Sequence, residues 1–183
     1  MNAIAEAPLV APSTGAATPP AAKTSTSAAP TAAASMPAEY LSFRLGGEEY
    51  GIDILRVQEI RSYEEPTRIA QSAPFMKGVV NLRGVIVPII DLRLKLQCPS
   101  AEYNAATVVI VLSVGGRVVG VVVDAVSDVL QLAATHIKAA PQMASNMGPG
   151  CITGIGSIND RMLILLDIQA LLAGPEVGLL DAA

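Results

Sequence analysis

Two aspartates in matching surroundings are the side chains of this sequence best suited to acid–base chemistry. Asp91 and Asp167 each end an apolar run, and each precedes a short stretch with helical spacing. In duplicated β domains, two such carboxylates can meet and separate their pKa values, as an aspartic hydrolase requires. Each is, however, followed by Leu92 or Ile168 and then by helix, without the small, hydroxyl and glycine residues that expose a catalytic carboxylate. We therefore interpret both as caps of helical turns.

The remaining reactive side chains do not predict an active site. His136 is the only histidine, so neither a metal site nor a charge-relay triad can draw on two imidazoles. Cys98 and Cys151 are distant in the sequence and lack a second thiol at CxxC spacing. The glycine pairs at 46–47 and 115–116 precede strand-like runs and not helices, which argues against a phosphate-binding loop. We expect no catalytic residue, no cofactor and no metal, and hence a protein that is not an enzyme.

These residues belong to a chain that repeats itself. The stretch 78–96 reads as a β-hairpin followed by a helical turn, and it aligns without a gap with 154–172 at a constant offset of 76 positions. Upstream, 41–60 aligns with 110–129 at an offset of 69. A self-match over most of the chain is stronger than any single motif. It predicts two related β-rich units that pack on each other.

Composition divides the chain into a tail and one ordered domain. Residues 1–38 are nearly all Ala, Pro, Ser and Thr, which bury too little apolar surface to offset the entropy of ordering, so we expect a disordered tail. The domain, 39–180, holds the two repeats at about 40–97 and 106–173. Whether terminal strands are exchanged between the repeats stays open.

Charge and hydropathy limit the partners and the location. The formal net charge is −4 at pH 7, Lys and Arg form no cluster, and Trp is absent, which argues against nucleic acid as a ligand. The tail lacks the basic start and apolar core of a secretion signal, and the later apolar runs are too short to span a bilayer. Together with two distant cysteines, this favours a cytoplasmic protein with reduced thiols.

Strand patterns indicate which surfaces are buried. Val-rich runs at 107–114, 117–123 and 125–132 are continuously apolar, which predicts burial on both of their faces. Pro88 has no N–H, so its strand is expected at a sheet edge or at a bulge. Such an edge is a place where a ligand or an extended peptide could dock.

Period-two counting over 57–61 predicts an exposed surface. Val57, Glu59 and Arg61 share one face of this strand, and Ile60 lies on the other. If Ile60 is buried, Val57 is an exposed apolar side chain flanked by opposite charges. A single exposed valine is common and needs no function. An apolar centre with a charged rim is also typical of a protein-docking patch.

Several motifs together resemble the chemotaxis coupling (adaptor) protein CheW family. The most specific is KGVxNLRGxxxPIxDL, which spans 77–92. VQEI at 57–60, the hairpin-like 43–52 and the Val-rich 120–130 extend the resemblance, which runs from about 40 to 180 and leaves only the Ala/Pro-rich tail outside. The resemblance implies a mainly β fold of two small five-stranded SH3-like β-barrels packed around a shared core.

The resemblance also implies a function. Members of this family are non-catalytic scaffolds that couple the cytoplasmic tips of methyl-accepting chemoreceptors to the regulatory domain of the histidine kinase CheA. The chain would then lie in the cytoplasm, associated with membrane-bound receptor arrays through protein partners and without inserting into the membrane. An alternative is a twin-barrel module that binds a peptide or small ligand at the Pro88 edge, outside chemotaxis.

The resemblance assigns partner-binding residues by position. Asn81, Leu82, Arg83 and Gly84, at the tip of the first hairpin, would form or support the receptor site. Val57 and Glu59 match a strand that contacts the kinase or the receptor in relatives. Two further candidates, for which a turn and a core role are simpler explanations, are Gly78 and Ile86. For Arg83 we favour a partner contact, because a guanidinium on a hairpin tip can bind a carboxylate with two hydrogen bonds.

Overall fold

A computed structural model describes residues 15, 36–141, 147–148, 150–174 and 177. The chain divides into two units, Met1–Ala33 and Ala34–Ala183, and the second holds all the helices and strands reported below. The disordered tail expected over 1–38 lies almost entirely outside the described residues, and the first strand begins at Ala38.

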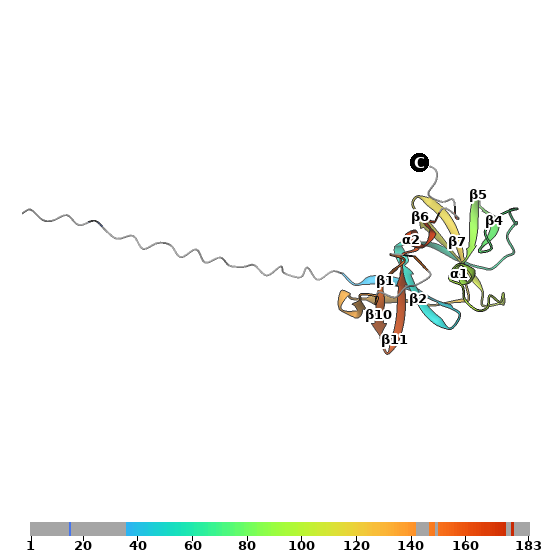
Figure 1. Ribbon diagram of the computed structural model, residues 1–183. Helices are drawn as coiled ribbons and strands as arrows, with labels where there is room; N and C mark the ends of the chain where they lie inside the picture. The colour runs from blue at the N-terminus through green and yellow to red at the C-terminus, as the bar shows by residue number, and fades with distance from the viewer. Residues whose placement is uncertain (1–14, 16–35, 142–146, 149, 175–176, 178–183) are drawn as a thin grey trace, which may run out of the picture. The chain divides into compact units, whose positions relative to one another are not determined.

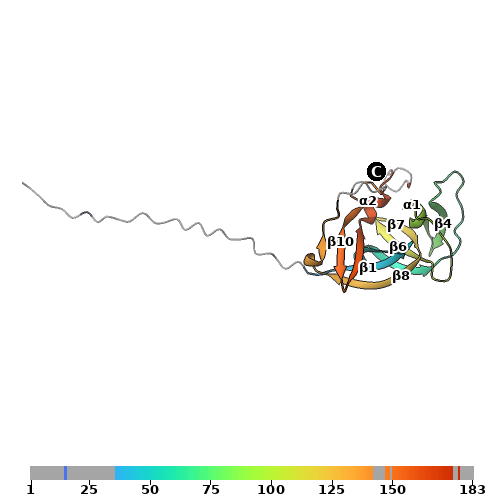
Figure 2. The same cartoon turned by 60° about the horizontal axis from the view of Figure 1, so that its bottom comes forward.

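The second unit is mainly β, as predicted, and consists of two sheets (Figures 1 and 2). The six-stranded sheet has the order β8-β1-β2-β11-β10-β9, with strands β1 (Ala38–Leu45), β2 (Glu48–Asp53), β8 (Ala125–Leu132), β9 (Ile137–Lys138), β10 (Ile152–Ile158) and β11 (Arg161–Leu166). The five-stranded sheet has the order β3-β6-β7-β5-β4, with strands β3 (Val57–Ser62), β4 (Met76–Leu82), β5 (Val85–Asp91), β6 (Val108–Val114) and β7 (Arg117–Val123). The short helices are η1 (Ile54–Arg56), α1 (Leu92–Lys95), η2 (Ala134–His136) and α2 (Ile168–Leu172).

The register of the two sheets confirms the internal duplication. Under the offsets read from the sequence, the order β3-β6-β7-β5-β4 maps strand by strand onto β8-β1-β2-β11-β10. The parallel pair Ile89 and Gly120 in one sheet corresponds to Leu165 and Gly51 in the other. The first hairpin of each repeat therefore lies between strands of the other repeat: β1–β2 lies between β8 and β11, and β6–β7 lies between β3 and β5.

The sixth strand of the larger sheet also has a counterpart in the smaller one. Lys138 of β9 pairs with Ile155 of β10. At the corresponding place, Thr67 forms an isolated bridge with Val79 of β4. The N–H of each residue donates to the carbonyl oxygen of the other, with an N to O distance of 2.9 Å in both hydrogen bonds. The difference between five and six strands is thus only the length of this pairing.

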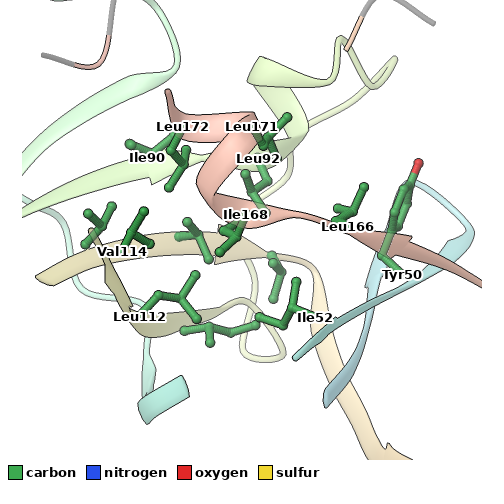
Figure 3. Packing of buried hydrophobic residues seen from close by; sticks show 14 of the residues in the cluster. Tyr50, Ile52, Ile90, Leu92, Leu112, Val114, Leu166, Ile168, Leu171 and Leu172 are labelled. Atoms are coloured by element: carbon green, nitrogen blue, oxygen red, sulfur yellow. The ribbon is translucent and has the colours of Figure 1, made fainter. Parts of the chain in front are cut away.

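One hydrophobic core is shared by the two sheets. Tyr50 and Ile52 of the six-stranded sheet and Leu112 and Val114 of the five-stranded sheet belong to the same cluster, and Ile168 of α2 packs between them (Figure 3). Each sheet also has a smaller core of its own: Val87, Ile89, Val109, Val111 and Val122 in one, and Leu132, Leu163 and Leu165 in the other.

The expectation of burial on both faces holds for two of the three Val-rich strands. In β6 and β7, successive residues alternate between the shared core and the smaller core of their sheet. In β8 the expectation is wrong: this strand lies at the edge of the six-stranded sheet, and Val129 is 52% exposed. Apolar content alone did not distinguish an edge strand from a central one. The polar residues Ser127 and Asp128, on the exposed part of β8, were the signal of its edge position.

The capping interpretation of the two aspartates is confirmed. The Asp91 carboxylate accepts a hydrogen bond from the Arg93 backbone N–H at 3.0 Å, at the start of α1. The Asp167 carboxylate accepts from the N–H groups of Gln169 at 2.8 Å and Ala170 at 3.1 Å, at the start of α2. Each carboxylate satisfies amides that a helix leaves without a partner at its N-terminus.

Of the two positions expected for Pro88, the sheet edge is wrong, whereas a bulge does lie next to it, between Met76 and Gly78 of the paired strand β4. β5 lies between β4 and β7 and pairs with β4 from Val85 to Ile90. Its parallel pairing with β7 begins only at Ile89, so Pro88 stands one residue before that ladder. A proline is tolerated there because its missing N–H is not required by the parallel ladder. The alternative of a ligand site on an edge at Pro88 therefore loses its structural basis.

Candidate docking surface

The turn between β4 and β5 presents Arg83 to solvent. Arg83 has a backbone φ of +52°, and its side chain is 81% exposed. Its Nη2 donates a hydrogen bond to Glu59 Oε2 on β3 at 2.8 Å. Two residues selected from separate stretches of the sequence thus meet on one surface of the five-stranded sheet.

Two of the other predicted tip residues shape the turn. Asn81 Oδ1 accepts a hydrogen bond from the Gly84 N–H at 2.8 Å, which closes the turn around Leu82 and Arg83. Gly84 has a φ of +88°, a conformation that favours glycine, and the space where a Cβ would stand is open. Asn81 and Gly84 therefore hold Arg83 in place through the backbone.

Apolar side chains surround the Arg83–Glu59 pair. Val85 is 52% exposed and Ile86 is 61% exposed, although both begin an apolar strand. Leu82 is half-buried and packs against the smaller core of the sheet. A shallow groove of about 200 Å³ runs past these residues and is lined by Gln58, Glu59, Leu82, Arg83, Val85, Val87, Val111 and Val118. Ile86 follows Val85 in β5, so its side chain points to the opposite face of the hairpin, and it does not line this groove. We call Glu59, Leu82, Arg83 and Val85 the Arg83 patch.

The predicted exposure of Val57 is wrong. Val57 is half-buried and packs against the shared core, whereas Ile60 is 44% exposed. The cause is a register shift between Val57, which pairs with Leu112, and Glu59, which pairs with Val111. Because cross-strand partners share a face, this bulge turns Val57 toward the shared core and Glu59 toward the groove.

Gly78 has a structural role in β4. It has a φ of +141°, and a Cβ at this position would lie 2.1 Å from the carbonyl oxygen of Thr67. This close approach accompanies the bridge between Thr67 and Val79. Of the two further candidates named from the sequence, Ile86 thus lies on the exposed surface and Gly78 does not depend on a partner for its explanation.

The charges of the patch leave the guanidinium available for a partner. Glu59 is flanked by Arg83 at 2.8 Å and by Arg61 at 3.8 Å. Exposed ion pairs of this kind contribute little to stability, typically about 0–1 kcal/mol. A partner carboxylate could take up donors of Arg83 that Glu59 leaves open, while Leu82 and Val85 supply apolar contact.

The second repeat has a related arrangement. Asp128, the counterpart of Glu59 at the offset of 69, accepts a hydrogen bond from Arg161 Nη1 at 3.3 Å. Arg161 also pairs with Glu49 of β2, and its neighbour Met162 is 65% exposed. Arg161 corresponds to Val85 and not to Arg83, whose counterpart is Asn159. The two copies have therefore kept an acid–arginine contact between the same pair of elements but have moved the arginine.

Sequence reasoning missed two exposed apolar residues. Val85 follows the polar tip and reads as the start of a buried strand, but the turn lifts it out of the core. Leu55 of η1 is 86% exposed, just after the cap that Asp53 provides to its N–H at 2.9 Å. The signal that could have found Leu55 is the Asp53 cap, because a capped turn between two strands leaves its central side chain outside the sheets.

A buried polar cluster was missed as well. Asp91 and Arg93 are fully buried, and the Tyr103 hydroxyl donates a hydrogen bond to Asp91 Oδ2 at 2.7 Å. Burial alone would raise the pKa of Asp91, but hydrogen bonds from Arg93 and Tyr103 outweigh it and hold this pKa below its ordinary value. Burial and the hydrogen bond to Asp91 both raise the pKa of Tyr103.

The described residues contain neither a cluster suited to a metal ion nor a helix suited to span a membrane. Within them, His, Cys, Asp and Glu form no group of three or more that could hold a metal ion. In the same part of the chain, no helix is long and apolar enough to cross a membrane.

Comparison with known proteins gives consistent matches. The family model described as CheW-like domain matches residues 39–176. The chain is 57% identical over 143 residues to the chemotaxis protein CheW of Klebsiella aerogenes, which covers 78% of this chain and 86% of the relative. It is 34% identical to the chemotaxis protein CheW of Bacillus subtilis, over 71% of this chain and 83% of the relative.

A solved structure matches the fold. The crystal structure of the scaffolding protein TtCheW from Thermoanaerobacter tengcongensis superposes with a TM-score of 0.71 at 28% sequence identity. The match covers 77% of this chain and 96% of that protein.

Proposed function

The chain belongs to the CheW-like domain family, and we propose that it couples the cytoplasmic tips of methyl-accepting chemoreceptors to the regulatory domain of a CheA-type histidine kinase. As a member of this family it is a chemotaxis scaffold and not an enzyme. Its task is then to hold partners in a fixed geometry, so that a change in the receptor alters the kinase equilibrium through differential contact energy.

The observation that supports this proposal best is the Arg83 patch. It combines an exposed guanidinium, a half-buried carboxylate at 2.8 Å and the Val85 side chain, which is 52% exposed. A docking surface commonly combines such an exposed apolar side chain with a charged rim. Asn81 and Gly84 hold this surface, and Val57 anchors the strand that carries Glu59.

We assign the Arg83 patch to a protein partner of the array, either the receptor tip or the kinase regulatory domain. In this proposal the chain resides in the cytoplasm and reaches membrane-bound arrays only through these partners. The surface charge suits this role, because opposite charges on the rim set register and association rate more than affinity.

Reconstitution tests the proposal directly. The full chain is mixed with a CheA-type kinase and a chemoreceptor cytoplasmic fragment, and autophosphorylation of the kinase is followed with each component omitted in turn. We expect receptor control of the kinase only when the chain is present, together with measurable binding of the chain to each partner alone. Absence of binding to both partners, with a folded chain, would contradict the proposal.

A further inference from the structure

A buried arginine joins several segments at the boundary between the two sheets. Arg93 donates from Nε to Asp91 Oδ1 at 3.0 Å and from Nη2 to Asp91 Oδ2 at 2.8 Å. Its Nη1 donates to Asp124 Oδ1 at 2.9 Å and to the Glu102 carbonyl oxygen at 2.6 Å. The Tyr103 ring covers the guanidinium, with its centroid 4.6 Å from Cζ. We call Asp91, Arg93, Tyr103, Asp124 and the Glu102 carbonyl the Arg93 hub.

The hub is directional because a guanidinium is planar and offers its donors in a fixed fork. Asp91 takes one edge of the fork in a bidentate pair, and Asp124 and Glu102 share the next nitrogen. Both Asp91 and Arg93 are fully buried, so any tilt of one partner would leave a buried charge without its hydrogen bonds. A buried contact with four hydrogen bonds from one guanidinium fixes orientation.

Asp124 connects the hub to both sheets. β7 of the five-stranded sheet ends at Val123, and β8 of the six-stranded sheet begins at Ala125, so Asp124 is the residue at which the chain crosses between sheets. Its second oxygen, Oδ2, accepts the Gly46 N–H at 2.7 Å, in the turn between β1 and β2. Asp91 ends β5 of the five-stranded sheet. The contacts therefore run from one sheet, through Arg93 and the crossing residue, into the other.

The duplication shows that this clamp exists at one crossing only. The counterpart of Arg93 is Gln169, and Asp167, the counterpart of Asp91, acts as a helix cap. The counterpart of Asp124 is Leu55, in the crossing from β2 to β3, where it is 86% exposed. Of two crossings related by the repeat, one is tied into a buried ion cluster and the other is a short surface helix.

We propose that Arg93 is a positioning residue: through its hydrogen bond to Asp124, where the chain crosses between the sheets, it holds the two sheets in one fixed relative orientation. This inference rests on the proposed scaffold function. The hub then determines how strongly binding of one partner at one sheet affects a partner bound at the other sheet. The hub touches neither Arg83 nor Glu59, so its loss changes transmission between partners and leaves each single contact surface intact.

The first test uses the full chain alone. Asp124→Ala removes one of the two acceptors of Arg93 Nη1 and the acceptor of the Gly46 N–H. Amide residual dipolar couplings report the orientation of each sheet. In the parent protein, couplings from both sheets fit one alignment tensor; in the variant, we expect the six-stranded sheet to need a tensor of its own. Exchange of the Gly46 amide is expected to accelerate about tenfold, the usual effect of losing one hydrogen bond to a charged group. A single common tensor in the variant overturns the proposal.

Two further variants keep this test decisive. Glu102→Ala is the matched control, because Glu102 contributes only its backbone carbonyl to the hub and its side chain is outside it; we expect its couplings and Gly46 exchange to match the parent. If Asp124→Ala does not fold, Asp124→Asn, which keeps the shape and the acceptor for Gly46, is expected to show the same change to a smaller degree. Failure of both variants to fold would make the hub a folding requirement and overturn the positioning role.

The second test separates the hub from the proposed function. With kinase domain and receptor fragment, Asp124→Ala is expected to bind each partner alone within about twofold of the parent, while receptor control of the kinase falls about fivefold, within the range of coupling changes caused by remote residues. Equal loss in binary binding and in control would overturn the transmission role. A parent chain that binds neither partner would contradict the scaffold function, and the dipolar couplings would still decide whether Arg93 positions the sheets.

Discussion

Arg83 Nη2 lies 2.8 Å from Glu59 Oε2, although the two residues are 24 positions apart in the sequence. Glu59 lies on β3 and Arg83 on the turn between β4 and β5, so the pair spans the opening between the two edge strands of the five-stranded sheet. The pair can stabilise the sheet, or it can present the guanidinium to a partner. These two roles give different results on mutation.

Arg83→Glu is expected to weaken binding of the receptor fragment or of the kinase domain at least about tenfold, because a docking guanidinium is replaced by a charge that repels the partner carboxylate. The thermal midpoint should shift by less than about 4 °C, since an exposed ion pair contributes about 0–1 kcal/mol. Calorimetric titration and thermal denaturation measure the two effects. A large loss of stability would instead make Arg83 a structural residue.

Arg68→Glu is the matched control for this charge reversal. Arg68 is 79% exposed, close to the 81% of Arg83, and it also pairs with a glutamate, Glu65 at 3.7 Å. Its reversal should leave binding unchanged. The double variant Arg83→Glu with Glu59→Arg restores the ion pair with exchanged charges; binding should stay weak if Arg83 contacts the partner and recover if the pair acts only within the sheet.

Val57 and Glu59 are neighbours but should respond differently to a change of charge. Val57→Asp is expected to lower the free energy of unfolding by about 2 kcal/mol, because it places a charge against the shared core. Glu59→Lys should cost about 1 kcal/mol or less but should reduce partner binding, since it puts a third cation beside Arg61 and Arg83. Urea unfolding and titration with each partner separate these effects. Equal stability of both variants would contradict the bulge between the two residues.

Local patterns in the sequence were sufficient for the duplication, the hairpins and the helix caps. The offset that relates Gly78 to Gly154 also relates the bulges of β4 and β10, which fall between Met76 and Gly78 and between Ile152 and Gly154. The exchange of hairpins between sheets could not be predicted, because β1–β2 and β6–β7 have the same local pattern and only long-range pairing decides which sheet each one joins.

The candidate site was predicted in part for similar reasons. The tip containing Arg83 is visible from its turn residues, but one extra residue in β3 moved Val57 to the core-facing side that Ile60 shares. The Arg93 hub left no local signal, since Arg93 lies among leucines at the start of a helical turn and its partner Asp124 is 31 positions away. Its recognition required the tertiary structure.

Gly78→Ala should destabilise the protein much more than Gly84→Ala. A Cβ on Gly78 would lie 2.1 Å from the Thr67 carbonyl oxygen, so backbone must move and the bridge to Val79 must break, at a cost of about 3 kcal/mol or more. A Cβ on Gly84 meets open space and only the positive φ is unfavourable, which costs about 1 kcal/mol. Urea unfolding of both variants measures the difference. Similar losses would show that φ alone governs both sites.

Tyr103→Phe should reveal the hub through the pH dependence of stability. The pKa of Asp91 is below its ordinary 3.8 in the folded protein, so the stability that the carboxylate contributes is complete above 3.8 and is lost as the pH falls through the folded pKa. The pKa of Tyr103 is raised above its ordinary 10.0, so its contribution is complete below 10.0 and is lost as the pH rises further. The stability difference between parent and variant should therefore be largest between these limits, about 1–2 kcal/mol for one hydrogen bond to a buried charge, and should shrink on both sides. Urea unfolding at about pH 3, pH 7 and pH 10.5 measures it.

Tyr63→Phe is the control for this prediction, because it alters the ring packed 4.6 Å from that of Tyr103 but keeps the hydrogen bonds from Arg93 and Tyr103 to Asp91. The stability of this variant should fall at acid pH as that of the parent does. A parent–Tyr103→Phe difference that stays constant from pH 3 to pH 10.5 would show that the hydroxyl does not stabilise the Asp91 carboxylate.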